Sequence, residues 1–350
     1  MTTIRDVARR AGVSVATAAR ALGDYGYTSP RTRQRVLRAA RALDYHPNAI
    51  ARSMIKGRTQ TLAVVVSDNA NPFFASVVRG IEDAVLGQGY AIILCNADED
   101  PAKEALYLRA IRQKRVDGLV ISPSGGPGGL LRGLMASGIP IVQVDRRLAR
   151  LPADAVVVDN RAGVRAAIEH LVRLGHRRIG LLGGPRRLYT GRERLQAYLA
   201  AMREARLPVA DGWVLEGTFK EASGHALVGR FLRLRRRPTA IVVANNLMTI
   251  GALLALKEAG VRIPEEMAVV GFDDMDWAPI LTPPLTAIAQ PARDLGAAAG
   301  ALLLERVTGA FAGRPRTVVL QPRLVVRESC GTRAAPSWAY TEQESRGPTA

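Results

Sequence analysis

The first sixty residues carry apolar side chains at the spacing of short helices. Apolar residues recur three or four positions apart at Ile4, Val7, Ala8 and Ala11. Gly12 suits the left-handed backbone that ends a helix, and Ser14 is a favourable N-cap for the next one. The pattern therefore predicts a helix over 4–11, a turn, and a second short helix over 15–22.

A third helix is predicted from about Pro30 to Leu43. Its predicted apolar face consists of Val36, Leu37, Ala40 and Leu43. The second helix has few large apolar residues and places Thr17 and Arg20 where they could meet a DNA major groove. Two short helices around a glycine turn, braced by a third, form a helix-turn-helix. We predict a DNA-binding head, the alternative being a three-helix unit with no DNA role.

From Thr61 onward the pattern changes to continuous apolar runs of strand length. These runs are 61–67, 91–95, 118–122, 139–144, 179–182, 240–244 and 267–272. Helical patterns separate most of them, near 73–88, 102–114, 161–174, 190–206, 222–235 and 247–259. Such alternation predicts parallel sheets covered by helices on both faces. So many units suit two lobes better than one sheet, and a late helix near 292–309 suggests that the chain crosses back to the first lobe. The predicted fold class is an α-helical helix-turn-helix head plus a two-lobed, doubly wound parallel-sheet α/β sensor.

Charge and composition narrow the partners. The 350 residues carry a net charge of +18, and residues 1–60 hold half of this excess, with twelve Arg and Lys against three Asp. This asymmetry predicts a polyanion partner at the head, although arginine-rich composition, with five lysines among 49 basic residues, is an alternative explanation. No apolar run approaches the ~18 residues that span a bilayer, and the start has no signal-peptide core. We expect a cytoplasmic protein without membrane contact.

The two cysteines, Cys95 and Cys330, offer no disulfide framework. Cys95 ends an apolar run that is typical of a buried strand.

Polar and aromatic residues directly follow the predicted strands. Because ligands of open parallel sheets bind beyond the carboxyl ends of the strands, these residues are candidate ligand contacts. Strand ends supply Asn71, Phe73, Phe74, Asp145, Arg146, Asn245 and Asp273. Three more come from Arg192 early in the helix after the loop 183–185, Phe219 after the short run 213–215, and Gln290 at the end of 285–289. Together they predict one polar cavity between two lobes.

Each candidate also has a purely structural explanation. Pro72 could start a helix whose core includes Phe73 and Phe74. Asp273 and its neighbour could form a turn and an N-cap, and Arg146 could be a solvated arginine in a basic run. Their shared placement at strand ends favours the ligand site.

The head resembles the lactose/galactose repressor (LacI/GalR) family. The resemblance rests on Thr3-Ile4-Arg5-Asp6-Val7-Ala8, Ala11-Gly12-Val13-Ser14, Thr17, Arg20 and the hinge-like segment 44–54, and it continues to about Cys330. It implies that Val15, Ala16 and Arg20 face base edges and that Ser14, Thr17 and Asn48 contact phosphates. The dipeptide Ala18-Ala19 departs from the family's Val-Ser and removes one hydroxyl contact.

The family's hinge helix implies further DNA contacts at Ala51 and Met54. Met54 takes the place of a leucine that wedges into the minor groove, and ordinary packing is the alternative. The hinge is shorter than an isolated helix needs to persist in water, so its order is expected to depend on DNA and on a second subunit.

The sensor resembles the ribose-binding protein and its repressor relatives, which are periplasmic-binding-protein-like. The matching positions are Asn71, Phe73, Phe74, Asp145, Arg146, Arg192, Asn245, Asp273 and Gln290, with Phe219 as an aromatic wall. Asn246 departs from the family's usual Asp and makes the rim of the pocket less negative. The resemblance implies a sugar or sugar-like effector, for example a pentose.

Two other classes of protein fit the chain less well. An enzyme is not expected: the four histidines have no metal spacing, nucleophile-elbow and phosphate-loop motifs are missing, and the loop 125–129 is a poor dinucleotide fingerprint. No catalytic residue, metal or cofactor is therefore predicted. A solute-binding protein of a transporter would lack the head and carry an export signal.

These expectations combine into a sequence-specific regulator, with repression as the expected outcome. A recognition helix spans few base pairs, which favours a homodimer on a pseudo-palindromic double-stranded operator; a tetramer would need a C-terminal heptad that is missing here. The expected domains are the helix-turn-helix domain 1–46, the hinge 47–59, the ligand-binding domain 60–330 and a disordered tail 331–350. Within the third, the N-lobe spans about 60–160 and 291–320, and the C-lobe about 161–290 and 321–330.

Overall fold

The head is a three-helix unit whose ends are capped as the sequence predicts. The computed structural model describes residues 2–23, 25–45, 58–126 and 128–332. The head helices are α1 (Ile4–Ala11), α2 (Val15–Gly23) and α3 (Pro30–Ala42). Gly12 ends α1 with φ of 59°, and the Ser14 hydroxyl accepts a hydrogen bond of 3.1 Å from the Thr17 amide at the start of α2.

The core of the head consists mainly of small side chains. It contains Val7, Ala8, Ala11, Ala18, Ala21, Val36, Ala39 and Ala40. The prediction that Leu37 lies on the apolar face of α3 is wrong, because its side chain is exposed. The buried stripe runs instead through Val36, Ala39 and Ala40, with Leu43 packed against it at the end. Small residues let the three helices approach closely within only 45 residues.

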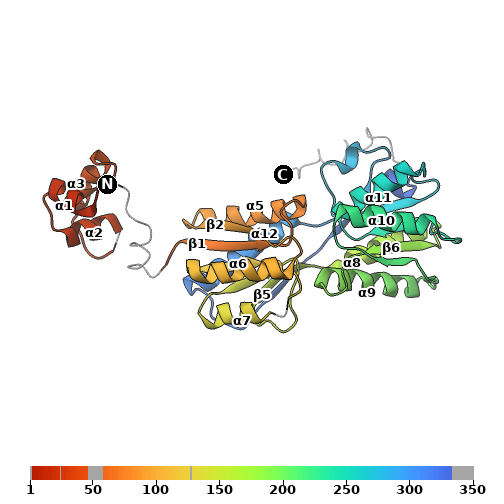
Figure 1. Ribbon diagram of the computed structural model, residues 1–350, viewed down its shortest axis with the longest axis horizontal. Coiled ribbons are helices and arrows are strands. Elements are labelled where there is room, and N and C mark those ends of the chain that lie inside the picture. Colours follow the sequence, from red (N-terminus) through yellow and green to blue (C-terminus); the bar gives the residue numbers. More distant parts are fainter. Residues whose placement is uncertain (1, 24, 46–57, 127, 333–350) are drawn as a thin grey trace, which may run out of the picture.

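Residues 58–126 and 128–332 fold into two lobes (Figure 1), each with a six-stranded sheet. The N-lobe sheet has the strand order β11-β5-β4-β3-β1-β2, and the C-lobe sheet has the order β12-β10-β9-β8-β6-β7. The N-lobe strands are β1 (Thr61–Val66), β2 (Ala91–Asn96), β3 (Gly118–Ile121), β4 (Ile141–Val144), β5 (Asp154–Val158) and β11 (Thr317–Leu320). The C-lobe strands are β6 (Ile179–Gly183), β7 (Val214–Glu216), β8 (Ala240–Val243), β9 (Ala268–Phe272), β10 (Thr286–Ala289) and β12 (Arg323–Val325). All pairings are parallel except that of β10 with β12.

Helices cover the sheets and the chain passes between the lobes three times. The N-lobe has α5 (Pro72–Leu86), α6 (Pro101–Lys114), α7 (Gly129–Ala136) and α12 (Ala292–Thr308). The C-lobe has α8 (Asn160–Arg173), α9 (Tyr189–Glu204), α10 (Glu221–Leu232), α11 (Asn246–Glu258) and the 3-10 turns η1 (Ala278–Ile280) and η2 (Glu328–Cys330). The crossings follow β5, β10 and β11, so α12 returns to pack on α5, which confirms the predicted fold class.

Three local features differ from the sequence-based expectation. β2 was expected to be buried, but it lies at the edge of its sheet and leaves Ile93 and Leu94 exposed, although Cys95 is buried. β5 follows β4 without an intervening helix and was not predicted. α7 begins at Gly129, the last residue of the segment 125–129, and was not predicted either.

No helix in the described parts of the chain is long and apolar enough to cross a membrane.

Candidate ligand cavity and DNA-facing surface

The carboxyl ends of strands from both sheets meet at one cavity between the lobes. The residues that line it are Asn71, Phe73, Phe74, Glu99, Asp145, Arg146, Thr190, Arg194, Phe219, Asn245, Asp273 and Gln290. Nine of the ten residues predicted as ligand contacts are among them, Arg192 being the exception. These side chains come together because a parallel sheet presents all the carboxyl ends of its strands at one edge. Their role as ligand contacts stays a prediction.

Arg192 points away from the cavity, and Arg194 takes its place. The Arg192 side chain is 42% exposed, whereas Arg194 is buried. Two positions along a helix turn a side chain by about 200°, so the two arginines face opposite sides of α9. Arg194 Nε donates to Asn160 Oδ1 over 2.7 Å, a second nitrogen donates to the Ala244 carbonyl, and the guanidinium lies 3.5 Å from the centroid of the Phe272 ring.

Arg146 and Glu99 form a buried ion pair on the N-lobe side of the cavity. Two guanidinium nitrogens donate to the two Glu99 oxygens over 2.6 and 2.7 Å, and one of them also donates to the Ser67 hydroxyl over 3.0 Å. The guanidinium lies 5.3 Å from the centroid of the Phe219 ring. Arg146 is therefore not a solvated arginine, and Glu99 is a cavity residue that the sequence analysis missed even though it closely follows a predicted strand.

Each lobe contributes one buried aspartate to the cavity: Asp145 follows β4 of the N-lobe, and Asp273 follows β9 of the C-lobe. Burial raises the pKa of Asp145 to about 6, opposed by the charges of Arg146 and Arg194. Burial also raises the pKa of Asp273, opposed by Arg194 and by hydrogen bonds from Gln290 and the Asn246 amide. The cavity thus combines two carboxyls whose pKa values are raised with two buried guanidiniums.

Several polar atoms of the cavity have no hydrogen-bond partner in the described structure. They are the Thr190 hydroxyl, Gln290 Oε1 and Arg146 Nε. Arg146 Nε lies 3.4 Å from Asp145 Oδ2 but without hydrogen-bond geometry. Leaving such groups unpaired costs roughly 1–3 kcal/mol each. The cavity can therefore gain from a ligand that both donates and accepts hydrogen bonds.

The cavity is nearly closed in this conformation. Its free volume is about 20 Å³, which is room for about one water molecule. Phe73 and Phe74 lie edge to face, with ring centroids 5.1 Å apart, and Phe219 fills the space against Gly184. A ligand larger than water can enter only when the lobes move apart.

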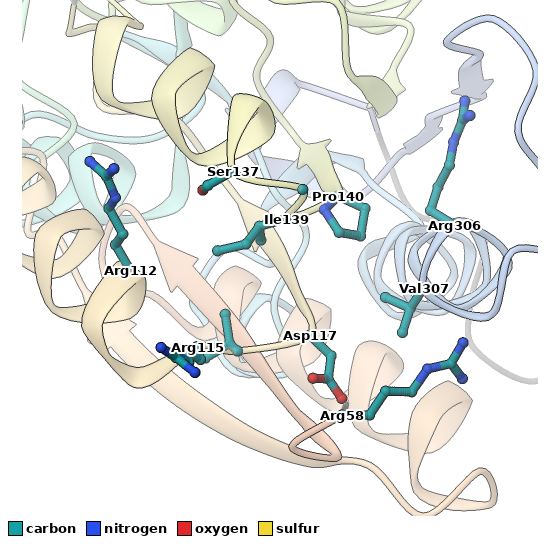
Figure 2. A pocket seen from close by; sticks show the side chains of 11 residues that line it. Arg58, Arg112, Arg115, Asp117, Ser137, Ile139, Pro140, Arg306 and Val307 are labelled. Carbon is teal, nitrogen blue, oxygen red and sulfur yellow. The ribbon is translucent and has the colours of Figure 1, made fainter. Parts of the chain in front are cut away.

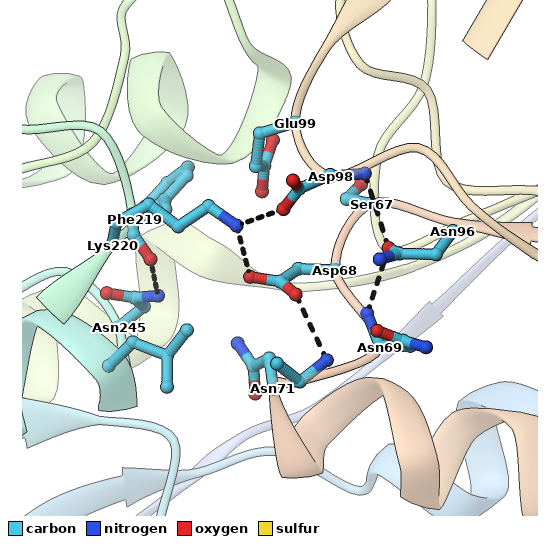
Figure 3. A network of polar contacts seen from close by, with 12 residues as sticks. Ser67, Asp68, Asn69, Asn71, Asn96, Asp98, Glu99, Phe219, Lys220 and Asn245 are labelled. Atoms are coloured by element: carbon cyan, nitrogen blue, oxygen red, sulfur yellow. Dashed lines mark hydrogen bonds and ion pairs between the residues drawn. The ribbon is translucent and has the colours of Figure 1, made fainter. Parts of the chain in front are cut away.

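Contacts between the lobes hold this closed arrangement (Figure 3). Lys220 Nζ of the C-lobe donates to Asp68 Oδ2 over 2.6 Å and to Asp98 Oδ1 over 2.5 Å, both in the N-lobe. Asn246 Nδ2 donates to Asn71 Oδ1 over 2.8 Å, so the residue that departs from the family's Asp bridges the lobes. Lys220 directly follows a predicted site residue but was not singled out from the sequence.

The segment that begins at Pro72 has the structural role considered above, and two of its residues also line the cavity. Pro72 begins α5, and Asn71 Oδ1 accepts from the Phe73 amide over 2.9 Å as its N-cap. Phe73 and Phe74 belong to the N-lobe core and also line the cavity. No group of three His, Cys, Asp or Glu side chains that could hold a metal ion occurs among the residues described by the structure.

One side of α2, together with the preceding Ser14, forms a slim, exposed surface. Val15 is 44% exposed, and Ser14, Ala16 and Arg20 are also exposed, while Thr17 is half-buried. Arg20 lies along the helix, with Nε 3.4 Å from the Ala16 carbonyl. The predicted hinge contacts Asn48, Ala51 and Met54 lie outside the described residues.

Arg35 of α3 supports the turn between the first two helices. A guanidinium nitrogen donates to the Gly12 carbonyl over 3.2 Å. This contact stabilises the turn between α1 and α2. The sequence pattern did not distinguish Arg35 from other exposed arginines.

Comparison with known proteins finds separate family matches for the head and for the two-lobed part of the chain. Residues 3–48 match the lacI family of bacterial regulatory proteins, and residues 168–330 match a periplasmic binding protein-like domain. The HTH-type transcriptional repressor PurR of Photobacterium profundum is 37% identical over 330 residues, which cover 94% of this chain and 98% of the relative.

Two solved structures show similar folds. The lac repressor dimer bound to operator and the anti-inducer ONPF has a TM-score of 0.81 at 28% identity, covering 94% of this chain and 99% of that one. A LacI family transcriptional regulator from Enterococcus faecium with bound ribose has a TM-score of 0.69 at 30% identity, covering 77% of this chain and 98% of that one.

Proposed function

The chain belongs to the lacI family of bacterial regulatory proteins and is a ligand-regulated DNA-binding repressor, and from this premise we propose that its effector is a sugar or sugar-like polyol bound between the lobes. One observation carries the effector class: three buried polar atoms of one cavity, Thr190 Oγ1, Gln290 Oε1 and Arg146 Nε, lack partners within the described residues. Donors and acceptors in one small space suit adjacent hydroxyl groups.

Aromatic and charged side chains of the cavity support the same class of ligand. Phe73, Phe74 and Phe219 offer apolar faces for the carbon skeleton of a sugar, while Asp145, Asp273 and Arg194 offer bidentate contacts for its hydroxyls. The Enterococcus faecium relative holds ribose. A pentose is the first candidate here.

The head carries the DNA-binding part of the proposal. We infer that Ser14, Val15, Ala16, Thr17 and Arg20 of α2 read an operator, and that hinge residues Asn48, Ala51 and Met54 complete the contact. The lac repressor relative is a dimer on its operator, and a homodimer on a pseudo-palindromic site is the matching proposal for this chain.

The proposed domains follow from these roles. The helix-turn-helix domain spans 1–46, the hinge 47–59 and the ligand-binding domain 60–330. A repressor acts where the chromosome is, so we place the protein in the cytoplasm. We also infer that it is no enzyme, because its relatives act as repressors.

Thermal melting against a ligand panel tests the effector class. Pentoses, hexoses, nucleosides, nucleobases and sugar acids are added to the purified full-length protein, and a ligand that binds only the folded state raises the melting temperature. A sugar hit that also changes operator affinity supports the proposal. A hit only among nucleobases or nucleosides, or none in the panel, contradicts it.

A further inference from the structure

A second pocket lies at the amino ends of the N-lobe strands, whereas the interlobe cavity lies at their carboxyl ends. β3 and β4 begin beside it, and its lining includes Asp117, Ile139 and Pro140 (Figure 2). Its volume is about 510 Å³, within the range of about 300–1,000 Å³ typical of small-molecule sites. We infer that this pocket binds a small organic anion that carries phosphate groups, at a site separate from the interlobe cavity.

Guanidinium groups stand on two sides of the pocket. Arg112 and Arg115 belong to the end of α6, and Arg58 comes from the segment before β1 (Figure 2). All three are exposed. Arginine is the preferred residue for phosphate because its planar fork donates two parallel hydrogen bonds and keeps its charge at all physiological pH. A ligand with two anionic groups could engage both sides.

Two of these arginines have no acceptor within the described structure. The side chains of Arg112 and Arg115 form no hydrogen bond or ion pair with any described residue, and Arg58 interacts with the Tyr90 hydroxyl. Elsewhere on the N-lobe, exposed arginines such as Arg79 and Arg293 pair with Asp83. Arg109 of α6 also lacks a partner among the described residues, so what distinguishes Arg112 and Arg115 is that both line this pocket.

The negative charges near the pocket are already engaged. Asp117 Oδ1 accepts from the Thr59 amide and Oδ2 from the Gln60 amide, each over 2.8 Å. Arg306, which also lines the pocket, is bound to Asp154 over 2.8 and 2.9 Å and is not counted as an available cation. The lining thus holds three other guanidiniums and one carboxylate whose oxygens are both hydrogen-bonded, which leaves a positive field for an anion.

The floor of the pocket indicates an organic ligand rather than a bare ion. Val116, Ile139, Pro140 and Val307 contribute apolar surface between the arginines. A carbon skeleton can lie on this floor while its phosphates reach the rim. The Asp117 contacts also fix residues 59 and 60, so an occupant would sit beside the end of the predicted hinge.

Calorimetric titration of the full-length protein with pyrophosphate tests the site in the absence of DNA. The wild type is expected to bind pyrophosphate with a dissociation constant below about 1 mM. The double variant R112Q/R115Q should bind at least tenfold more weakly. The matched control R109Q/R173Q removes two exposed charges, one on α6 and one on the C-lobe, and should stay within twofold of the wild type. Melting temperatures of both variants check the fold.

Two results would overturn the inference. One is equal weakening of pyrophosphate binding by both double variants, which would indicate general attraction of anions to a basic protein. The other is the absence of pyrophosphate binding by the wild type, in which case the small-anion site does not exist. If R112Q/R115Q then also loses operator affinity, the arginines serve the phosphates of operator DNA instead.

Discussion

Three residues of the interlobe cavity hold left-handed backbone conformations although none is glycine. The φ angles are 65° at Asp145, 64° at Phe219 and 74° at Asp273. Aspartate tolerates this region, but an aromatic residue there costs of the order of 1–3 kcal/mol, and such strain tends to cluster at ligand clamps. At Phe219 the conformation is held by a hydrogen bond of 3.0 Å from Asn245 Nδ2 to its carbonyl.

Arg194 and Arg192 offer a matched pair for testing the ligand cavity. Replacing Arg194 with Gln should weaken effector binding about 10–150-fold, the equivalent of one charge-assisted hydrogen bond. Replacing Arg192 with Gln should change affinity less than about twofold, because its side chain faces solvent. Titration calorimetry with the effector found by melting measures both. If the two variants bind equally well, the cavity is not the effector site.

Asp145 should make folding stability depend on pH. Its pKa in the folded protein is about 6, above about 3.9 for an unfolded aspartate. Between these values the folded state keeps a proton that the unfolded state has lost, so stability falls as pH rises from about 4 to 6 and then levels off. Each pKa unit corresponds to about 1.4 kcal/mol.

Denaturant unfolding of the wild type and D145N measures this contribution. The stability of the wild type relative to D145N should be greatest at about pH 4 and should decline by about pH 7, because asparagine does not titrate and accepts the same backbone conformation. A difference between the two proteins that stays constant with pH would mean that Asp145 ionises normally.

The cavity residues show what sequence can and cannot fix at this scale. Ten residues were predicted as ligand contacts from the positions of strands, and nine of them line the cavity. The prediction succeeds because the topology of a parallel sheet brings the residues after its strands to one end. The choice between Arg192 and Arg194 depends on which face of α9 turns inward, and periodicity alone did not reveal it. The pairing of Lys220 with Asp68 depends on the approach of two separate lobes.

At the level of elements, α5 and α12 are in contact at positions that only glycine can fill. A Cβ atom added at Gly80 would lie 2.0 Å from the Arg293 carbonyl oxygen, and one added at Gly296 would lie 1.9 Å from that of Val77. The returning helix thus meets the first helix of the N-lobe backbone to backbone.

Replacing Gly296 with Ala should destabilise the N-lobe by about 1–3 kcal/mol, the usual cost of forcing atoms into a packed core. Gly133 of α7 is the control, since a Cβ there meets nothing within 4 Å. Alanine at that helical position should stabilise by about 0.5–1 kcal/mol. Urea unfolding of both variants measures the difference, and a neutral G296A would show that the helices can separate at little cost.

Some elements could be predicted from the sequence and others could not. Most strands and helices follow from alternating apolar runs, as β1, β3 and β8 illustrate. β5 was missed because β4 leads to it without a helix, and α7 because it begins with glycine and is short. The edge position of β2 depends on sheet order, which an apolar run of Ile and Leu does not encode.

α2 is the element whose surface should decide operator choice. Replacing Arg20 with Ala should weaken specific operator binding about 5–150-fold, as expected for one base contact worth roughly 1–3 kcal/mol. Non-specific DNA binding should fall much less, and the melting temperature of the sensor should stay unchanged. Fluorescence anisotropy with operator and scrambled duplexes separates the two. An equal loss on both duplexes would make Arg20 a phosphate contact only.

At the scale of the whole molecule, the lobes are closed over a cavity with little free volume. Effector entry requires opening, and the effector must then favour one separation of the lobes if it is to alter DNA binding. Coupling between two sites is typically about 1–3 kcal/mol. The ion pairs of Lys220 with Asp68 and Asp98 cross this interface and oppose opening.

Replacing Lys220 with Met should shift the unliganded protein toward open lobes. Methionine keeps the apolar stem but removes the charge. Partly exposed ion pairs are worth up to about 1 kcal/mol, so the ratio of open to closed forms should rise roughly two- to fivefold. Small-angle scattering of the unliganded protein should record a larger radius of gyration. The control variant K257M removes an exposed lysine on α11 and should change neither the ratio of open to closed forms nor the radius of gyration. If K220M scatters like the wild type, packing of the rings and not this ion pair keeps the lobes together.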